Sequence, residues 1–99
     1  MNETTDTPTL APGQFERIAK ALADPRRFAI LETIAGREDC PYQGVCGRFP
    51  ITKATVSHHM KELLNAGLIE AEREGQQMVA RFRPEVLAAY RAELGRRLG

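Results

Sequence analysis

Residues 52–67, TKATVSHHMKELLNAG, constrain the fold most, because they specify both ends of one helix. Thr52 is suited to cap the helix, and Ile51 before it can pack on Val56 as a hydrophobic staple. Gly67 can adopt the left-handed conformation that ends a helix. Apolar side chains recur at helical spacing and predict one buried face, made of Val56, Met60, Leu63 and Leu64. This is the most strongly specified helix in the sequence.

Two further helices are predicted upstream of this segment. The first spans about residues 13–23, and Asp24 and Pro25 then occupy the N-cap and first-turn positions of the second. Gly36 is placed to end the second helix. The side chains expected to be buried recur at helical spacing and are Phe15, Ile18, Ala19 and Leu22 in the first helix and Phe28, Leu31, Ile34 and Ala35 in the second.

Residues 37–50 are the least regular part of the sequence. Two prolines and two glycines argue against a long helix there. Tyr42, Val45 and Phe49 nevertheless fall at helical spacing, so we expect a short helix.

The last third of the chain predicts a β-hairpin and a terminal helix. LIEAER and MVARFR are separated by EGQQ, which fits two short strands around a turn. Pro84 then opens a helix whose apolar stripe has no later segment to cover it, and a second copy of the chain is the simplest cover. The predicted homodimer interface joins the first and last helices and comprises Phe15, Ile18, Leu22, Leu87, Tyr90, Leu94 and Leu98.

Length and composition set the broad class. With 99 residues the chain has room for one small domain, predicted at 13–99, after a disordered lead-in at 1–12 that has nothing to bury. Apolar runs too short to span a bilayer and a polar N-terminus predict a cytoplasmic protein without membrane contact. The net charge of +1 neither demands nor excludes a polyanionic partner, so local charge must decide.

Charge does gather on the outward face of the helix at 52–67. Lys53, Ser57 and Lys61 lie four residues apart with Ala54 and His58 beside them, and no carboxylate lies between the two lysines. Lysines can contact phosphates, and short polar side chains can reach base edges. A short helix, then this helix, then a hairpin is the order of a winged helix-turn-helix domain. From the charge pattern alone, a solvated face without function fits equally well.

The adjacent histidines predict neither a metal site nor catalysis. His59 points about a hundred degrees away from His58 and lies near the core boundary, which favours a packed, hydrogen-bonded side chain. Neighbouring histidines on a helix diverge, whereas metal-binding pairs sit three or four residues apart. Neither has an evident nucleophile or orienting carboxylate, so we predict no catalytic residues and no enzyme.

Cys40 and Cys46 leave three interpretations open. In the cytoplasm they are expected to be reduced, and the spacing of Cys46 from Tyr42 and Phe49 is typical of a buried, inert thiol. Thiolates are also soft ligands that can bind an arsenical or another thiophilic ion. Alternatively, the pair can oxidise to a disulfide. None of these interpretations requires a resident cofactor.

Two segments, LADPRRFAILETIA (22–35) and ITKATVSHHMKELLNAGLIEAEREGQQMVARF (51–82), resemble the ArsR-type winged-helix transcriptional regulators. The shared features are the LADPxR start of the second helix, the VSHH-hydrophobic-K recognition helix, the AGLI end and the REG wing. The resemblance implies a mainly α winged helix-turn-helix fold with a small hairpin. It also implies a homodimeric repressor that binds a pseudo-palindromic operator in double-stranded DNA.

The resemblance and the cationic face together predict one set of DNA-binding residues, which are Thr52, Lys53, Ala54, Thr55, Ser57, His58, Lys61, Arg73, Gln76 and Gln77. Glu72 and Glu74 make the wing a poor attractor of phosphate, so we expect the wing to matter less than the lysines. The alternative is a winged-helix module that binds an acidic protein and never contacts DNA.

The family's metal-sensing patterns are not intact in this sequence. Cys40 and Cys46 are separated by five residues, whereas the family's metal-binding box is Cys-x-Cys. The last helix also has no histidine to act as a ligand. No metal site is therefore predicted with these residues beyond the open thiol hypothesis.

Overall fold

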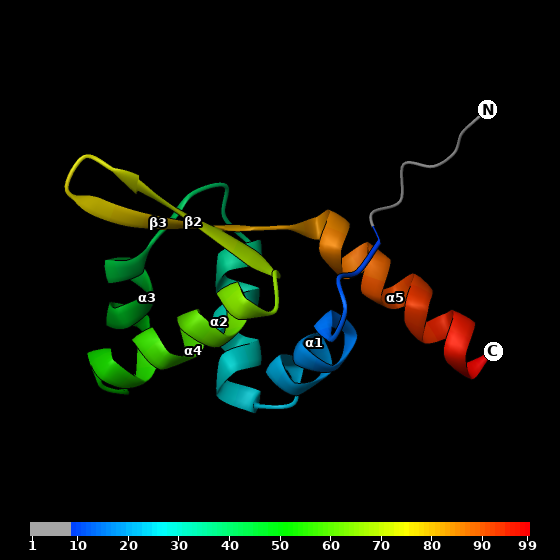
Figure 1. Cartoon of the computed structure of the whole chain (residues 1–99). Helices are drawn as coiled ribbons and strands as arrows, with labels where there is room; N and C mark the ends of the chain where they lie inside the picture. The colour runs from blue at the N-terminus through cyan, green and yellow to red at the C-terminus, as the bar shows by residue number, and fades with distance from the viewer. Residues whose placement is uncertain (1–8) are drawn as a thin grey trace.

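The computed structural model describes residues 9–99, which form five helices and a three-stranded antiparallel sheet (Figure 1). The sheet order is β1-β3-β2. None of the helices in this range is both long and apolar enough to cross a bilayer. The elements, in chain order, are α1 (Gln14–Leu22), α2 (Pro25–Ala35), β1 (Cys40–Pro41), α3 (Tyr42–Arg48), α4 (Lys53–Asn65), β2 (Ile69–Glu74), β3 (Gln77–Phe82) and α5 (Pro84–Leu98).

Of the lead-in expected at 1–12, the structure describes residues 9–12, and residues 1–8 lie outside the described range. Within that range, Leu10 is half-buried and packs against the core, so the expectation that this segment has nothing to bury is wrong at Leu10. The helix starts at Gln14, close to the predicted position.

The predicted ends of α4 are confirmed in detail. The Thr52 hydroxyl accepts the backbone N–H of Thr55 at 3.1 Å and so caps the first turn. At the other end Gly67 has φ 79° and donates its N–H to the Leu64 carbonyl, while Leu68 donates to the Leu63 carbonyl. This pair of bonds is a Schellman motif, which stops the helix and turns the chain into β2.

The buried face of α2 differs from the prediction. Phe28 is 43% exposed and Ala35 is also exposed, whereas Arg27 and Ile30 are buried. The apolar spacing did not predict this face correctly, because the Arg27 guanidinium is hydrogen-bonded in the interior. These bonds offset the cost of burying a cation at this position. The helix itself begins as predicted, with the Asp24 side chain accepting the backbone N–H groups of two following residues.

A third strand, β1, was not predicted. Cys40 pairs with Ala80 and Pro41 with Val79, so β1 lies on the free edge of β3. Two residues give no alternating pattern to detect, and a proline is tolerated here because β1 is an edge strand. The strand joins the end of α2 to the short helix α3, whose existence the sequence did predict.

The molecule is elongated, with principal extents of 44 × 28 × 22 Å. In Figure 1 the hairpin turn and the N-terminal end of α4 lie at one end, while α5 runs past α1 to the other end. The core between them is formed mainly by side chains of α1, α2, α4 and the sheet. The N-terminal end of α4 and the helix α5 are therefore far apart along the long axis (Figure 1).

Candidate nucleic-acid interface

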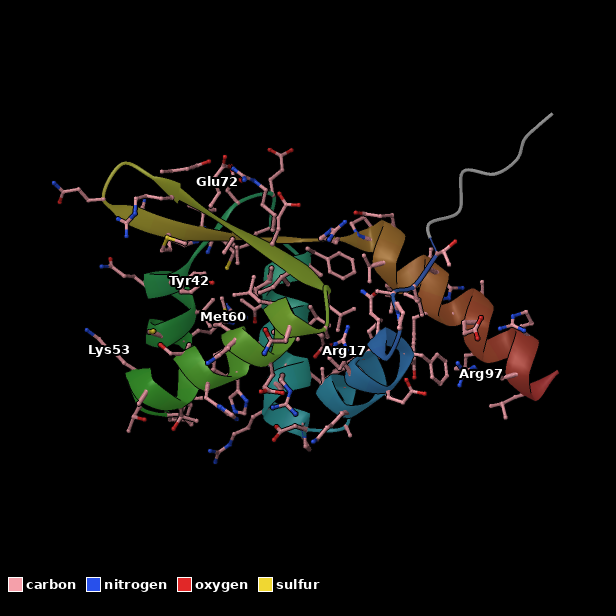
Figure 2. The ribbon with its side chains drawn as sticks, in the orientation of Figure 1. Arg17, Tyr42, Lys53, Met60, Glu72 and Arg97 are labelled. Atoms are coloured by element: carbon pink, nitrogen blue, oxygen red, sulfur yellow. The ribbon has the colours of Figure 1, made fainter. Side chains whose placement is uncertain are left out.

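The outward face of α4 has the orientation that the sequence predicted. Lys53, Ala54, Ser57, His58 and Lys61 are all exposed. The opposite face, with Val56, Met60 and Leu63, is fully buried in the core. Figure 2 shows Lys53 extending into solvent from the first turn of α4, below α3. The helix is thus held by its apolar side and presents a short row of cationic and hydroxyl groups to solvent.

The two threonines at the start of α4 have a structural role. Thr52 is exposed and Thr55 half-buried, and their hydroxyl oxygens lie 2.9 Å apart. Because the Thr52 hydroxyl also caps the helix, both hydroxyl groups are engaged in ordering the first turn. They hold Lys53 and Ala54 in place, and the direct DNA contact predicted for both threonines stays a prediction.

A hollow of about 490 Å³ lies between α3 and the exposed face of α4. It is lined by Tyr42, Gln43, Cys46 and Gly47 of α3 and by Lys53 and Ser57 of α4. Burial raises the pKa of the Tyr42 phenol, which therefore stays protonated at neutral pH. Sequence reasoning missed Gln43, an exposed amide that shares this hollow with two predicted DNA-binding residues. The sequence could have indicated Gln43, because it lies in the first turn of α3, the short helix directly before α4.

The wing is less acidic toward α4 than its sequence suggests. Arg81 forms ion pairs with Glu72 and Glu74 and with Asp39, the last at 2.6 Å. The hydrogen bonds that Arg81 donates to these carboxylates raise the pKa of its guanidinium. Because side chains alternate along a strand, Glu72 and Glu74 project from one face of the hairpin and Arg73 from the other. The acidic cluster is therefore turned away from Arg73.

The tip of the wing is a tight turn. Gly75 has φ 65°, a left-handed conformation that suits glycine, and it joins β2 to β3 with Gln76. Arg73, Gln76 and Gln77 are exposed around this turn. The turn lies at the same end of the molecule as the start of α4 (Figure 1). Gln77 pairs with Glu74, however, and so projects from the acidic face of the hairpin, opposite Arg73.

Most of the side chains predicted to bind a second copy are at least partly exposed. On α5, Leu98 is 81% exposed and Leu94 37%, whereas Leu87 and Tyr90 are half-buried. Leu22 is also half-buried on α1.

Two aromatic residues link α1 to α5 within one chain. The Phe15 ring stacks on the Tyr90 ring at 5.0 Å between centroids, and the Arg97 guanidinium lies 3.9 Å from the Phe15 ring centroid. Ile18 was wrongly assigned to the interface, because it is completely buried in the core of its own chain and has no surface to offer.

The two cysteines lie in different environments. Cys40 is completely buried in β1, and this burial raises the pKa of its thiol. Cys46 packs against the core but is only half-buried and lines the hollow, so it is less buried than its helical spacing predicted. The helical pattern could not reveal this, since it located the apolar side of α3 but not how far that side is covered. Within residues 9–99, no three His, Cys, Asp or Glu side chains gather as a metal site.

His59 is packed and hydrogen-bonded, as predicted. It is 6% exposed, and its Nδ1 lies 3.2 Å from Nη1 of Arg27. Burial is the main cause that lowers the pKa of His59, with a smaller opposing effect from Asp24. The exposed His58 and the buried His59 therefore lie in different environments, although they are adjacent in sequence.

Comparison with known proteins gives consistent matches. A family model described as a helix-turn-helix domain matches residues 22–72. The arsenical resistance operon repressor of Staphylococcus xylosus is 30% identical over 74 residues, covering 75% of this chain and 70% of the repressor. An ArsR-like transcriptional regulator from Rhodococcus sp. RHA1 has a TM-score of 0.78 at 22% identity, covering 86% of this chain and 79% of its own. This match supports the fold.

A third relative extends the comparison to assembly. It is the homodimeric winged helix-turn-helix DNA-binding domain of a possible ArsR-family transcriptional regulator from Mycobacterium bovis. Its TM-score is 0.71 at 26% identity, and the match covers 95% of this chain and 87% of that domain. The winged helix-turn-helix fold predicted from the sequence is confirmed.

Proposed function

The chain belongs to the ArsR-type family of winged helix-turn-helix transcriptional regulators, which are not enzymes, and from this membership we propose that it represses transcription by binding a specific double-stranded DNA site as a homodimer. One observation carries the proposal. Lys53, Ser57, His58 and Lys61 are exposed side by side on a helix whose other face is buried. We further propose a cytoplasmic protein, because that is where its target DNA would be met.

The exposed side chains of α4 divide into two groups. Lys53 and Lys61 neutralise phosphates, which supports affinity for any sequence. Ser57 and His58 donate or accept hydrogen bonds at base edges, and Ala54 allows close approach or contacts a thymine methyl. Only the second group distinguishes one sequence from another.

The wing adds contacts beside the recognition helix. Arg73, Gln76 and Gln77 contact the DNA backbone or the minor groove next to the major groove that receives α4. Because Glu72 and Glu74 are paired with Arg81 on the other face of the hairpin, they repel a phosphate at Arg73 less than unpaired carboxylates would. The wing remains a smaller contributor than the lysines of α4.

The homodimer forms through α1 and α5 and presents two copies of α4. The exposed Leu94 and Leu98 and the half-buried Tyr90 supply an apolar surface suited to a second copy. Two recognition helices reading successive major grooves would be separated by roughly 34–36 Å, one turn of the duplex. The operator is then pseudo-palindromic, and its occupation blocks access of RNA polymerase.

Selection of duplexes from a random pool tests the proposal. The recovered sites should share a two-fold motif, and Ser57→Ala or His58→Asn should change the preference among sites by about 1–3 kcal/mol per lost base contact. Lys53→Ala and Lys61→Ala should instead weaken binding to all duplexes. The role assignment is wrong if both classes of variant change site preference equally.

The same selection separates DNA reading from the alternative function. A module that uses the α4 face for an acidic protein partner would show no preference among duplexes. Steep salt dependence together with enrichment of one motif supports the regulator, because phosphate contacts release counterions and base contacts discriminate sequences.

A further inference from the structure

One buried polar contact joins the recognition helix to the rest of the molecule. Among residues 9–99, the buried polar or charged side chains are Arg27, 8% exposed, and His59, 6% exposed. They bond to each other, with 3.2 Å between Arg27 Nη1 and His59 Nδ1. Arg27 also donates from Nε to the Ala21 carbonyl at 2.9 Å and from Nη2 to the Lys20 carbonyl at 3.2 Å. The guanidinium therefore connects the end of α1 to the middle of α4.

This contact fixes the protonation state of His59. A guanidinium has only donors, so Nδ1 of His59 must accept and must carry no proton. The neutral ring then has its proton on Nε2. An imidazolium would place an N–H group against the Arg27 N–H and one positive charge beside another. The bond between Arg27 and His59 exists only while His59 is neutral.

Two other bonds show what the Arg27 contact adds. Gln14 donates to the Ala66 carbonyl at 3.0 Å, and Arg17 donates to the Asn65 carbonyl at 3.1 Å. These side chains of α1 hold only the C-terminal end of α4. His59 is in the middle of α4, directly beside the exposed His58, and the contact there fixes the part of the helix that faces DNA.

We propose that Arg27 is a positioning residue that orients α4 for DNA by holding neutral His59, so that protonation of His59 breaks this contact, changes the orientation of the recognition helix and lowers DNA affinity. The inference rests on the proposed DNA-binding function. It assigns a role in DNA binding to Arg27, which lies outside the DNA-facing surface, and it makes a neutral His59 a condition for binding. The carboxyl end of α1, which carries part of the proposed dimer surface, is thereby coupled to the helix that reads DNA.

Burial and the charged groups around His59 determine the pH at which the ring is protonated. Arg27, His58 and Arg26 oppose a positive charge on the ring, and Asp24 at the N-cap of α2 favours it. Burial disfavours the charged form more than any of these, so the pKa of His59 lies below its ordinary value. The ring is therefore neutral at neutral pH, and acid is the condition that breaks the contact.

His58 provides the matched control. It is adjacent to His59 on α4 but lies on the exposed, DNA-facing side, whereas the bond to Arg27 is made by His59. Replacing His58 therefore leaves the buried contact in place.

The experiment compares pH profiles of duplex binding. The probe is a fluorescein-labelled duplex recovered by selection from a random pool, titrated with full-length protein at constant ionic strength between about pH 5.5 and 8. In His59→Asn the side-chain oxygen takes the place of Nδ1 as acceptor and does not titrate. His58→Asn is the matched control on the adjacent residue. Each protein is compared with its own affinity at pH 8.

The wild type and His58→Asn should lose affinity in acid, approaching about a hundredfold per pH unit below the pKa of His59, because two protons, one from each copy in the homodimer, must leave for binding. His59→Asn should show a flat or rising profile. Coinciding profiles of the wild type and His59→Asn overturn the positioning role. If the selection recovers no duplex, the proposed function falls as well, so the two failures are distinguishable.

Nitrogen NMR of the His59 ring tests the contact without DNA. At pH 7.5 we expect a neutral ring with the proton on Nε2 and an unprotonated Nδ1 that accepts a hydrogen bond. Arg27→Lys, which keeps the charge but not the geometry, should shift the Nδ1 resonance. A ring with its proton on Nδ1 overturns the proposal, whether or not any variant folds.

Discussion

Replacing Lys61 with alanine should reduce the salt dependence of DNA binding by an amount that the structure allows us to calculate. The chain has three lysines, of which Lys53 and Lys61 lie on the exposed face of α4 and Lys20 lies on α1. All three are exposed, so removing any one of them removes one solvated positive charge. Only the two on α4 are placed to neutralise phosphate.

The magnitude follows from counterion release. The slope of log affinity against log salt concentration is about −0.9 for each phosphate neutralised. In a homodimer every substitution removes two ammonium groups, one from each copy of α4. Lys61→Ala should therefore make the slope less negative by about 1.8, and the same change is expected for Lys53→Ala.

Fluorescence anisotropy between roughly 50 and 200 mM NaCl, where phosphate contacts change affinity strongly, gives the slope. Lys20→Ala is the matched control, because it removes the same group from an exposed site on another helix. The control should keep the wild-type slope. If Lys20→Ala and Lys61→Ala change the slope equally, the charge acts at a distance and the assignment of Lys61 to a phosphate is wrong.

Three further outcomes are expected. Gly67→Ala should cost about 1–2 kcal/mol, because φ is 79° and the added Cβ would lie 2.5 Å from Gln14 Nε2. The Tm in a calorimetric scan should therefore fall by roughly 4–16 °C. An unchanged Tm would contradict the helix end described above. Gln76→Ala should weaken duplex binding less than Lys61→Ala does, and the reverse order in a titration would refute the lesser role of the wing. Arsenite or cadmium should leave duplex affinity unchanged, because burial keeps the Cys40 thiol protonated and inaccessible; a metal-dependent loss of affinity would contradict this.

Acid should also destabilise the fold through His59. Because the pKa of His59 is lowered in the folded chain, the unfolded chain binds the proton first as the pH falls below about 6.5. The stabilisation from the neutral ring is complete above that pH and decreases below it. Urea titrations between about pH 5 and 7.5 should show a smaller pH dependence for His59→Asn than for the wild type, and equal dependence would exclude His59 as the source.

The recognition helix could be predicted from sequence because each of its determinants is local. Thr52 and Gly67 specify its ends, and the apolar spacing specifies which side is buried. Once that side is known, the exposure of Lys53 and Lys61 follows from helical geometry. Local rules were sufficient wherever a side chain's environment is determined by its own helix.

Other features depend on partners distant in the chain. Arg27 is buried because two carbonyls of α1 and a nitrogen of His59, 32 residues away, accept its hydrogen bonds. Arg81 likewise depends on Asp39, which is 42 residues away and joins two wing carboxylates around it. A periodicity argument treats a charged residue as exposed, so it assigned Phe28 to the buried face in place of Arg27, and it could not show that Glu72 and Glu74 are paired with Arg81.

Hydroxyl-radical footprinting on the selected duplex tests most directly whether two copies of α4 address DNA through their exposed face. We expect two protected segments with centres about 10–10.5 base pairs apart, both lost when Lys53 and Lys61 are replaced by glutamate but retained in Lys20→Glu. A single protected segment, or protection that survives the double replacement on α4, would contradict this mode of binding.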